Sequence, residues 1–546
     1  MRFNFASKIF NEYRNLAKHP ALRRFMEHNQ KVFPTDKDVA RRKPVVLFEL
    51  NAMHSAHIAY SYLANVLATS NQAKIVAYVQ KPYRRTLQRL LFRIRRATGQ
   101  NEFGAYQSFG TTAFVEIELS PKQRDRALSV YVATFERLQS KLDIEALTIN
   151  GVWVGDLVYD SFLMTYKQPT IDKESAEFKQ SLLDSIECFV FWEDYLDIHD
   201  VKAINVSHCV YNLAIPLRIA LKKNIPVFHA NVTHIYRLNS ANLFAYNDFV
   251  YFRERFASLP PEVQQSGIAE AKRRIERRFA GEVGVDMAYS TKSAYGASRH
   301  PRLLKASDRK KILIATHCFF DSPHSYGNNI FPDFYEWLDF LGTIAEGSNY
   351  DWYIKTHPDY LPGTKEIIEA FIAKYPKFIL LPADASHHQI IAEGIDLALT
   401  VYGTIAFEYA ALGIPVINAS QNNPHIAYDF NLHAKDIDDY RRLLMGVEWL
   451  EFKIDKQQVY EYYFMRHIFN TENLFFDNYG RTLEELNGYD GQFTPAAYEK
   501  WLAQWTAEKH GATTTALQSF IKSGDFRMDY RHYGREFSIE SINRNL

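Results

Sequence analysis

The sequence predicts an α/β protein built from two doubly wound domains, and three observations carry this prediction. Short apolar runs rich in β-branched residues alternate with helical patterns along most of the chain. Such alternation predicts mostly parallel sheets whose ligand crevice lies at the carboxyl ends of the strands. The chain of 546 residues is too long for one typical core, and its 47% hydrophobic residues can fill two. A stretch rich in Gly, Ser, Lys and Arg at about 281–309 is the expected linker.

The expected strands fall into two sets, one on each side of this linker. The first set comprises residues 44–50, 75–79, 114–119, 147–150, 203–206 and 226–229, and the second comprises 311–316, 351–360, 397–402 and 414–417. We therefore expect an N-terminal domain at 39–290 and a C-terminal domain at 305–480. Helical extensions are expected at 1–38 and at 481–546, the second packing back on the domains.

The segment from Leu397 to Ser420 predicts a strand, a tight turn, a short helix and a second strand, which together suit a nucleotide phosphate. Gly403 permits the turn, and the Thr404 hydroxyl is typical of a helix N-cap. A helix that begins there directs free N–H groups and the positive end of its dipole toward an anion. Glu408 lies one turn later on the same face, where its carboxylate would accept hydrogen bonds from a ribose. The alternative is an ordinary βαβ unit with Thr404 as a cap and Glu408 in solvent.

Two further strand ends add polar residues to the same rim. The strand at 351–360 contains Lys355 and His357, and Pro358 favours an extended backbone at His357. A protonated His357 would neutralise a leaving phosphate. The strand at 311–316 runs into three more polar residues, His317, Asp321 and His324. A single histidine is more often structural, but three concordant strand ends favour a binding site.

The pairing of His357-Pro358 with Thr404 and Glu408, followed by the segment Ala411 to Val416, resembles the C-terminal half of bacterial surface-polysaccharide glycosyltransferases of the GT-B fold. It is most similar to enzymes that use CMP-activated ulosonic acids, namely capsule-type Kdo transferases and sialyl- or pseudaminyl-type transferases. The resemblance covers about residues 305–420. It implies that His357 and Thr404 contact the CMP phosphate and that Glu408 contacts the ribose. Further donor-binding residues are then expected at His317, Asp321, His324, Lys355, Pro358 and Gly403.

The resemblance also implies an architecture and a reaction. Two Rossmann-like domains would face a central cleft, and a nonulosonic acid or Kdo would pass with inversion to a hydroxyl of a surface polysaccharide or glycolipid. No metal and no other cofactor is implied. The base is expected from the N-terminal domain at Asp156, which follows Gly155 where a helix would begin, with its carboxylate facing the crevice. Plain N-capping by Asp156 is an equal alternative, and Asp160 would then be the base.

Three other functions stay open at this point. A CDP-polyol phosphotransferase of teichoic-acid synthesis would share the His-Pro motif and the cytidine nucleotide but would transfer a phosphoryl group. A UDP-sugar 2-epimerase would share the two-domain architecture. A non-catalytic scaffold of capsule assembly is the alternative that is not an enzyme.

Composition restricts the partners and the compartment. A net charge of +1 argues against general nucleic-acid binding, and three distant cysteines suggest neither a disulfide framework nor a zinc cluster. Without a bilayer-length apolar run or a signal-peptide pattern, the sequence predicts a cytoplasmic protein. The basic amphipathic stretch at 81–96 and the basic N-terminal segment predict peripheral contact with the inner face of the cytoplasmic membrane, with a solvated helix face as the alternative.

Overall fold

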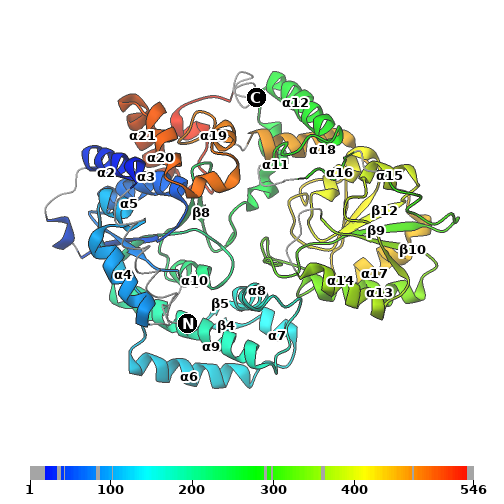
Figure 1. Cartoon of the computed structure of the whole chain (residues 1–546), viewed down its shortest axis with the longest axis horizontal. Coiled ribbons are helices and arrows are strands. Elements are labelled where there is room, and N and C mark those ends of the chain that lie inside the picture. Colours follow the sequence, from blue (N-terminus) through cyan, green and yellow to red (C-terminus); the bar gives the residue numbers. More distant parts are fainter. Residues whose placement is uncertain are drawn as a thin grey trace, which may run out of the picture.

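Two six-stranded sheets form the framework of the protein (Figure 1). The structure is a computed structural model, and it describes residues 19–33, 38–41, 43–80, 86–100, 102–287, 292–296, 299–357, 363–469 and 473–537. Most of the predicted N-terminal extension, residues 1–18, therefore lies outside the described residues.

The first sheet has the strand order β3-β2-β1-β6-β7-β8. Its strands are β1 (Val45–Glu49), β2 (Lys74–Tyr78), β3 (Thr111–Val115), β6 (Val201–Val206), β7 (Val227–Ala230) and β8 (Ile235–Leu238). All neighbouring pairs are parallel except β7 and β8. All five residues of β1 are buried, as expected for a central parallel strand that is covered on both faces.

The second sheet repeats this order as β11-β10-β9-β12-β13-β14. Its strands are β9 (Lys311–Ala315), β10 (Asp351–Lys355), β11 (Phe378–Leu380), β12 (Leu397–Thr400), β13 (Val416–Asn418) and β14 (Leu432–His433), all parallel. In both sheets the strand order reverses beside the first strand, which is the doubly wound pattern. The predicted α/β class with two Rossmann-like domains, the GT-B architecture, is confirmed.

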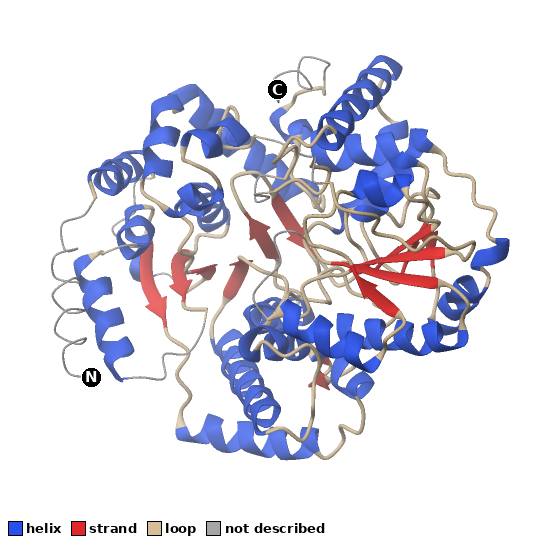
Figure 2. Ribbon diagram, turned by 45° about the vertical axis from the view of Figure 1, so that its right-hand side comes forward, coloured by secondary structure: helices blue, strands red, loops and turns tan. Residues whose placement is uncertain are grey.

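Helices cover both faces of the sheets (Figure 2). The N-terminal domain carries α2 (Pro20–Val32), α3 (His54–Ser70), α4 (Thr86–Thr98), α5 (Glu102–Ser108), α6 (Pro121–Phe135), α7 (Lys141–Glu145), α8 (Gly155–Tyr166), α9 (Ala176–Ile198) and α10 (Ile215–Lys222). The C-terminal domain carries α13 (Phe334–Gly347), α14 (Thr364–Lys374), α15 (His387–Ala392), α16 (Ile405–Leu412) and α17 (Ile437–Met445). Shorter 3₁₀ turns are η1 (Val39–Arg41), η2 (Asn212–Ala214), η3 (Asn247–Tyr251), η4 (Val447–Trp449), η6 (Tyr489–Phe493) and η7 (Tyr530–Tyr533).

One predicted strand has a different place. The segment expected at 147–150 is β4 (Thr148–Ile149), which pairs antiparallel with β5 (Val152–Trp153) in a separate hairpin. Asn150 and Gly151 both have positive φ, 50° and 73°, which is the conformation that a two-residue hairpin turn requires. The chain therefore reverses at this point instead of entering the main sheet.

The chain crosses between the domains through a packed group of helices. It leaves the N-terminal domain through α11 (Phe252–Ala257) and α12 (Pro261–Phe279), and it returns through α18 (Lys456–Tyr463) and the π-helix η5 (Phe464–Phe469). Buried aromatic and aliphatic side chains of these elements share one apolar cluster with Phe407 of α16.

The C-terminal helices return to the N-terminal domain. Figure 1 shows α19 (Tyr479–Glu485), α20 (Ala496–Gln504) and α21 (Ala507–Ser523) beside α2 and α3. Phe25 of α2 stacks on Tyr498 of α20 with 4.2 Å between ring centroids. Beyond α21, Met528 N donates to Ile235 O at 2.9 Å and Arg237 N donates to Phe526 O at 2.8 Å, so this segment extends the first sheet beside β8.

Candidate functional site

Three adjacent strands of the second sheet end in polar residues at one edge. The strand β9 leads into His317, β10 ends at Lys355 and is followed by His357, and β12 leads into Gly403. Because β9 lies between β10 and β12, these strand ends are neighbours. The predicted convergence of His317, His357 and the Gly403 turn is therefore present.

His317 is held rigidly at the centre of this edge. Its Nε2 lies 3.0 Å from Thr400 Oγ1, and its ring stacks on Phe334 at 4.5 Å. Burial, followed by the charge of His357, lowers the pKa of His317 to about 3. The ring is thus neutral near pH 7 and positions its neighbours without carrying charge.

His357 is the exposed histidine of the group. It is close enough to contribute, after burial, to the lowered pKa of both His317 and His387. Pro358, the other half of the predicted motif, lies outside the described residues. Beside His357, Lys355 is buried and donates to Ala383 O at 3.1 Å, and burial lowers the pKa of Lys355 to about 8.

The turn before α16 has the geometry of a close approach. A Cβ at Gly403 would lie 2.8 Å from Thr400 Oγ1 and 3.4 Å from His317 Cε1, so this position is restricted to glycine. Thr404 occupies the N-cap position, but its side chain makes no capping hydrogen bond. The expected cap is therefore absent, and the half-buried hydroxyl forms no hydrogen bond with any residue that the structure describes.

Glu408 is buried and already bound by other side chains. Arg278 of α12 donates to it through Nε at 2.7 Å, and Tyr295 donates through its hydroxyl at 3.0 Å. The alternative of a solvated Glu408 is wrong, and the predicted ribose contact stays a prediction. Sequence reasoning missed Arg278 and Tyr295 because they are 130 and 113 residues away along the chain.

The loop after β9, for which a donor-binding role is predicted, contacts the other domain. His324 Nδ1 lies 2.6 Å from Asp160 Oδ1 in a pair that is almost fully buried. Burial alone would lower the pKa of His324, but the Asp160 and Glu145 carboxylates outweigh this effect and raise it well above its ordinary value. Asp321 accepts a hydrogen bond from Tyr211 of the N-terminal domain at 2.7 Å. Both residues therefore hold the domains together.

Asp156 lies in the first turn of α8 as predicted, but its carboxylate does not face a crevice. Arg218 of α10 donates through Nη2 to Asp156 Oδ2 at 2.6 Å, and the two side chains are 2% and 1% exposed. Val154 occupies the N-cap position of this helix, so N-capping by Asp156 is also wrong. The buried guanidinium is the physical reason that the carboxylate turns inward.

A second polar edge, at the carboxyl ends of the first sheet, was not identified in full from the sequence. Glu49, the last residue of β1, is fully buried and accepts hydrogen bonds from Ser207 N at 2.7 Å and from the Ser207 hydroxyl. The Ser207 Oγ also lies 2.8 Å from Nδ1 of the exposed His208. Burial raises the pKa of Glu49 above its ordinary value, against the opposing effect of His208. A charged residue at the end of an apolar strand was the available signal.

The two polar edges meet at the domain boundary. Tyr211, three residues after His208, reaches Asp321 in the loop that begins at His317. Among the described ranges, no group of three or more His, Cys, Asp or Glu side chains is arranged to hold a metal ion. No helix of the described part is long and apolar enough to cross a membrane.

Comparisons with known proteins give only distant likenesses. No family model and no curated protein matches the chain. Among solved structures, UDP-GlcNAc 2-epimerase from Neisseria meningitidis bound to UDP-GlcNAc is 11% identical over 76% of this chain and 96% of its own, with a TM-score of 0.23. A glycosyltransferase from Rickettsia africae is 10% identical over 89% of this chain and 100% of its own, with a TM-score of 0.20. At these values the likeness carries no argument about function, and the fold is established by the two sheets themselves.

Proposed function

We propose that the protein is an inverting glycosyltransferase that moves a ulosonic acid from a CMP-activated donor to a hydroxyl of a surface glycan or glycolipid. The observation that carries the proposal is the joint placement of His357, Gly403 and Thr404 at one sheet edge. An exposed histidine, a side-chain-free backbone turn and an unengaged hydroxyl at a helix start are the groups that a nucleotide phosphate requires.

In this proposal the donor phosphate lies against the start of α16. Thr404 and the first N–H groups of the helix bind its oxygens, and the imidazolium of His357 neutralises the charge that develops as CMP leaves. Gly403 keeps the backbone open to the phosphate, since a side chain there would collide with Thr400. These protein groups supply the charge stabilisation, and we expect CMP binding without added metal.

The acceptor base is proposed to be His208, because Asp156 and Asp160 are both engaged in buried ion pairs. The Ser207 hydroxyl donates its one proton to Glu49, so it accepts the proton of His208 Nδ1. In the neutral ring, Nε2 then carries the free lone pair. That atom accepts the proton of the acceptor hydroxyl while the anomeric carbon loses CMP.

The first test is calorimetric titration with CMP, CDP, UDP and GDP, with and without magnesium. The proposal expects CMP to bind without metal, Thr404→Ala to weaken binding about 10- to 100-fold, and Thr404→Ser to keep it. The reason is that a hydrogen bond to a charged group contributes about 1.5–3 kcal/mol. Equal CMP affinity of Thr404→Ala and the unchanged protein would contradict the phosphate role.

The same titration also tests two alternative functions. Preference for CDP favours a polyol-phosphate transferase, and preference for UDP favours a UDP-sugar 2-epimerase.

For the base, His208→Gln is expected to lower kcat by about 10²–10⁴ while CMP affinity stays unchanged. The control is Ser161→Ala, at a serine of the same domain. If it lowers kcat by the same factor as His208→Gln, the effect is a general structural one.

Contact with an anionic membrane surface is part of the proposal and depends on α4. Leu90 and Ile94 are 53% and 45% exposed on this helix, which also carries Arg89, Arg93 and Arg96. Apolar side chains flanked by arginines are typical of interfacial helices. Flotation with vesicles of phosphatidylglycerol should weaken in Leu90→Ser/Ile94→Ser, and unchanged flotation would leave a solvated helix face.

A further inference from the structure

Arg466 is a half-buried cation without an anionic partner among the residues that the structure describes. It lies in the π-helix η5, on the segment that returns between the domains. The side chain is half-buried, and it makes no ion pair or hydrogen bond with the residues that the structure describes. None of its nitrogen atoms is among the fully buried polar atoms that lack a hydrogen-bond partner, so the guanidinium keeps some contact with solvent. Single π-helical turns are frequently found at functional sites.

Side chains of both domains surround this guanidinium. From the N-terminal domain, the Tyr246 ring lies 5.8 Å from it, and His234 and Asp248 interact with it electrostatically. From the C-terminal domain, Tyr326 and His425 are within its electrostatic reach. Arg466 therefore lies at the domain boundary and not within one core.

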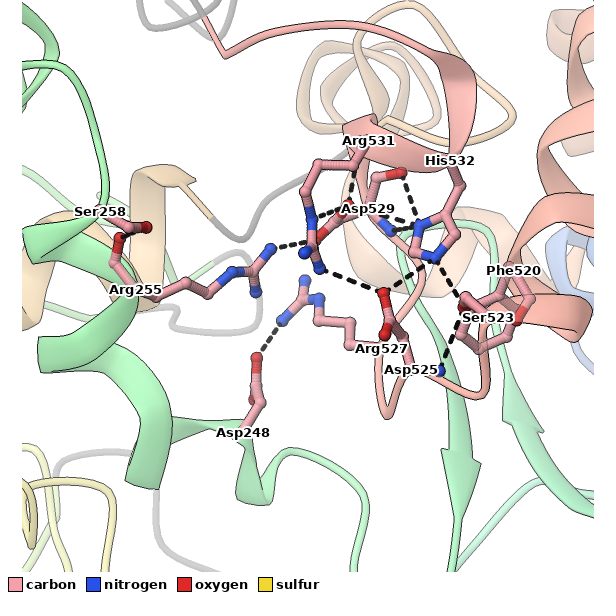
Figure 3. A network of polar contacts seen from close by, with 10 residues as sticks. All are labelled: Asp248, Arg255, Ser258, Phe520, Ser523, Asp525, Arg527, Asp529, Arg531 and His532. Carbon is pink, nitrogen blue, oxygen red and sulfur yellow. Dashed lines mark hydrogen bonds and ion pairs between the residues drawn. The ribbon is translucent and has the colours of Figure 1, made fainter.

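Asp248, the carboxylate that interacts with Arg466, is already paired with another arginine (Figure 3). Arg527 donates through Nη1 to Asp248 Oδ2 at 3.0 Å. Further along the same network, Asp529 is paired with both Arg255 and Arg531. Arg466 thus adds a positive charge that this network leaves uncompensated, and an enclosed charge is costly unless an anion compensates it.

Unpaired polar atoms accompany this charge. His425 is 1% exposed and neither ring nitrogen has a hydrogen-bond partner. Burial, then His433 and Arg466, lower the pKa of His425 well below its ordinary value, so the ring is neutral and carries an N–H to donate. An N–H donor beside a guanidinium suits an oxygen ligand with two or more acceptor atoms.

The same region is continuous with the phosphate edge. The Tyr326 ring contacts the Tyr402 ring at 5.0 Å, and Tyr402 contacts His317 at 4.9 Å. Tyr402 directly precedes the Gly403–Thr404 turn. These ring contacts connect the Gly403–Thr404 turn with Tyr326, which interacts with Arg466.

We propose that Arg466 binds a carboxylate or phosphate group of the substrate at the domain boundary, through paired hydrogen bonds from its guanidinium. The proposal deepens the proposed function, on which it rests for the identity of the substrate. In a ulosonic acid donor the anionic group is the sugar carboxylate, and in a phosphorylated glycolipid acceptor it is a phosphate.

The anion site is tested separately from nucleotide binding with inorganic pyrophosphate. His357→Ala serves as the parent, because it weakens the competing phosphate site. We expect pyrophosphate to raise the Tm of the parent and to lose at least tenfold in affinity when Arg466→Gln is added, as a charge-assisted pair predicts. Arg124→Gln, at an exposed arginine of α6, is the matched control and should change nothing. Equal pyrophosphate affinity with and without Arg466→Gln would overturn the proposal.

A second measurement identifies the group and keeps the test valid if Arg466→Gln fails to fold. CMP-N-acetylneuraminate and CMP are titrated into the unchanged protein, into Arg466→Gln and into Arg466→Lys, which keeps the charge but not the paired geometry. Loss of the extra affinity of the CMP-sugar over CMP in either variant assigns the sugar carboxylate. Retention of that extra affinity together with lost pyrophosphate binding assigns an acceptor phosphate. Arg466-dependent pyrophosphate binding in a protein that binds no CMP would reject the proposed function and keep the anion site.

Discussion

Replacing Asp156 by Asn tests whether this residue is structural, as its buried pairing with Arg218 indicates. The Arg218 guanidinium also lies 4.6 Å from the Trp153 ring and 5.2 Å from the Phe244 ring, so it cannot turn to solvent without losing these contacts. Asn would leave the guanidinium buried with a neutral partner. Breaking a buried ion pair on one side costs about 3–5 kcal/mol, and we expect a loss of this size.

Urea unfolding followed by tryptophan fluorescence measures the change, because Trp153 lies against the affected pair. With an m-value of about 3 kcal/mol/M, the midpoint of the N-terminal domain's unfolding transition should fall by about 1–1.7 M urea. Asp438→Asn, at an exposed aspartate of α17, is the control and should leave the midpoint within about 0.2 M. The double variant Asp156→Leu/Arg218→Met should recover most of the loss, since apolar replacement of a whole buried pair is often neutral.

The result separates the structural role from the catalytic one. A base that faces the substrate would lose turnover on substitution with little loss of stability. If Asp156→Asn costs less than about 1 kcal/mol, the reasoning from burial is refuted and Asp156 returns as a candidate base.

Three further outcomes are expected. Glu408→Gln should destabilise the C-terminal domain by about 2 kcal/mol in the same urea assay. This is less than the loss expected for a fully buried pair, because the arginine partner is partly exposed. If stability does not fall, the pair is not formed. Gly327→Ala should cost about 1–3 kcal/mol of stability, because φ is +69° and the new Cβ would lie 2.7 Å from Phe244 Cε2. Adding Phe244→Leu should restore part of the lost stability. An unchanged Tm in Gly327→Ala would contradict the close approach. The raised pKa of His324 stabilises the protein at any pH below the unfolded-state pKa of about 6.5, and this stabilisation is lost as pH rises through the folded-state pKa. Burial also raises the pKa of the partner carboxyl, Asp160, which acts in the same direction. Melting curves from pH 6 to 9 should therefore fall more steeply for the unchanged protein than for His324→Gln, and parallel curves would exclude this pair as the source.

The fold was predictable because its main strands carry their own signal. In β1, four apolar residues are followed by a single carboxylate. The alternation of apolar runs with helical patterns indicates parallel sheets without further information. In the two main sheets, the strands that were missed are β8, β11 and β14, which have four residues or fewer and lie at sheet edges. A short edge strand is extended because it pairs with the neighbouring strand, and the local sequence pattern carries no information about that pairing.

The site was predictable only where its parts are local. Gly403, Thr404 and Glu408 lie within six consecutive residues at the start of α16, and their spacing was enough to place them together. The ion pair of Asp160 with His324 joins residues 164 positions apart, and it buries both side chains between the domains. Long-range pairing of this kind depends on how the domains dock, so a strand-end rule predicts the position of such residues but not their partners.

The domains are held together on two opposite sides, which affects how a substrate enters. On one side the crossing helices α11, α12 and α18 share an apolar cluster, and on the other side α8 lies against the C-terminal domain (Figure 1). There Tyr159 donates to Asp333, Tyr211 donates to Asp321, and His324 pairs with Asp160. Rotation about the crossing helices would break these contacts, at about 1 kcal/mol for each hydrogen bond and more for the buried ion pair. Opening is therefore costly on the α8 side, so the two domains are held close together at this edge.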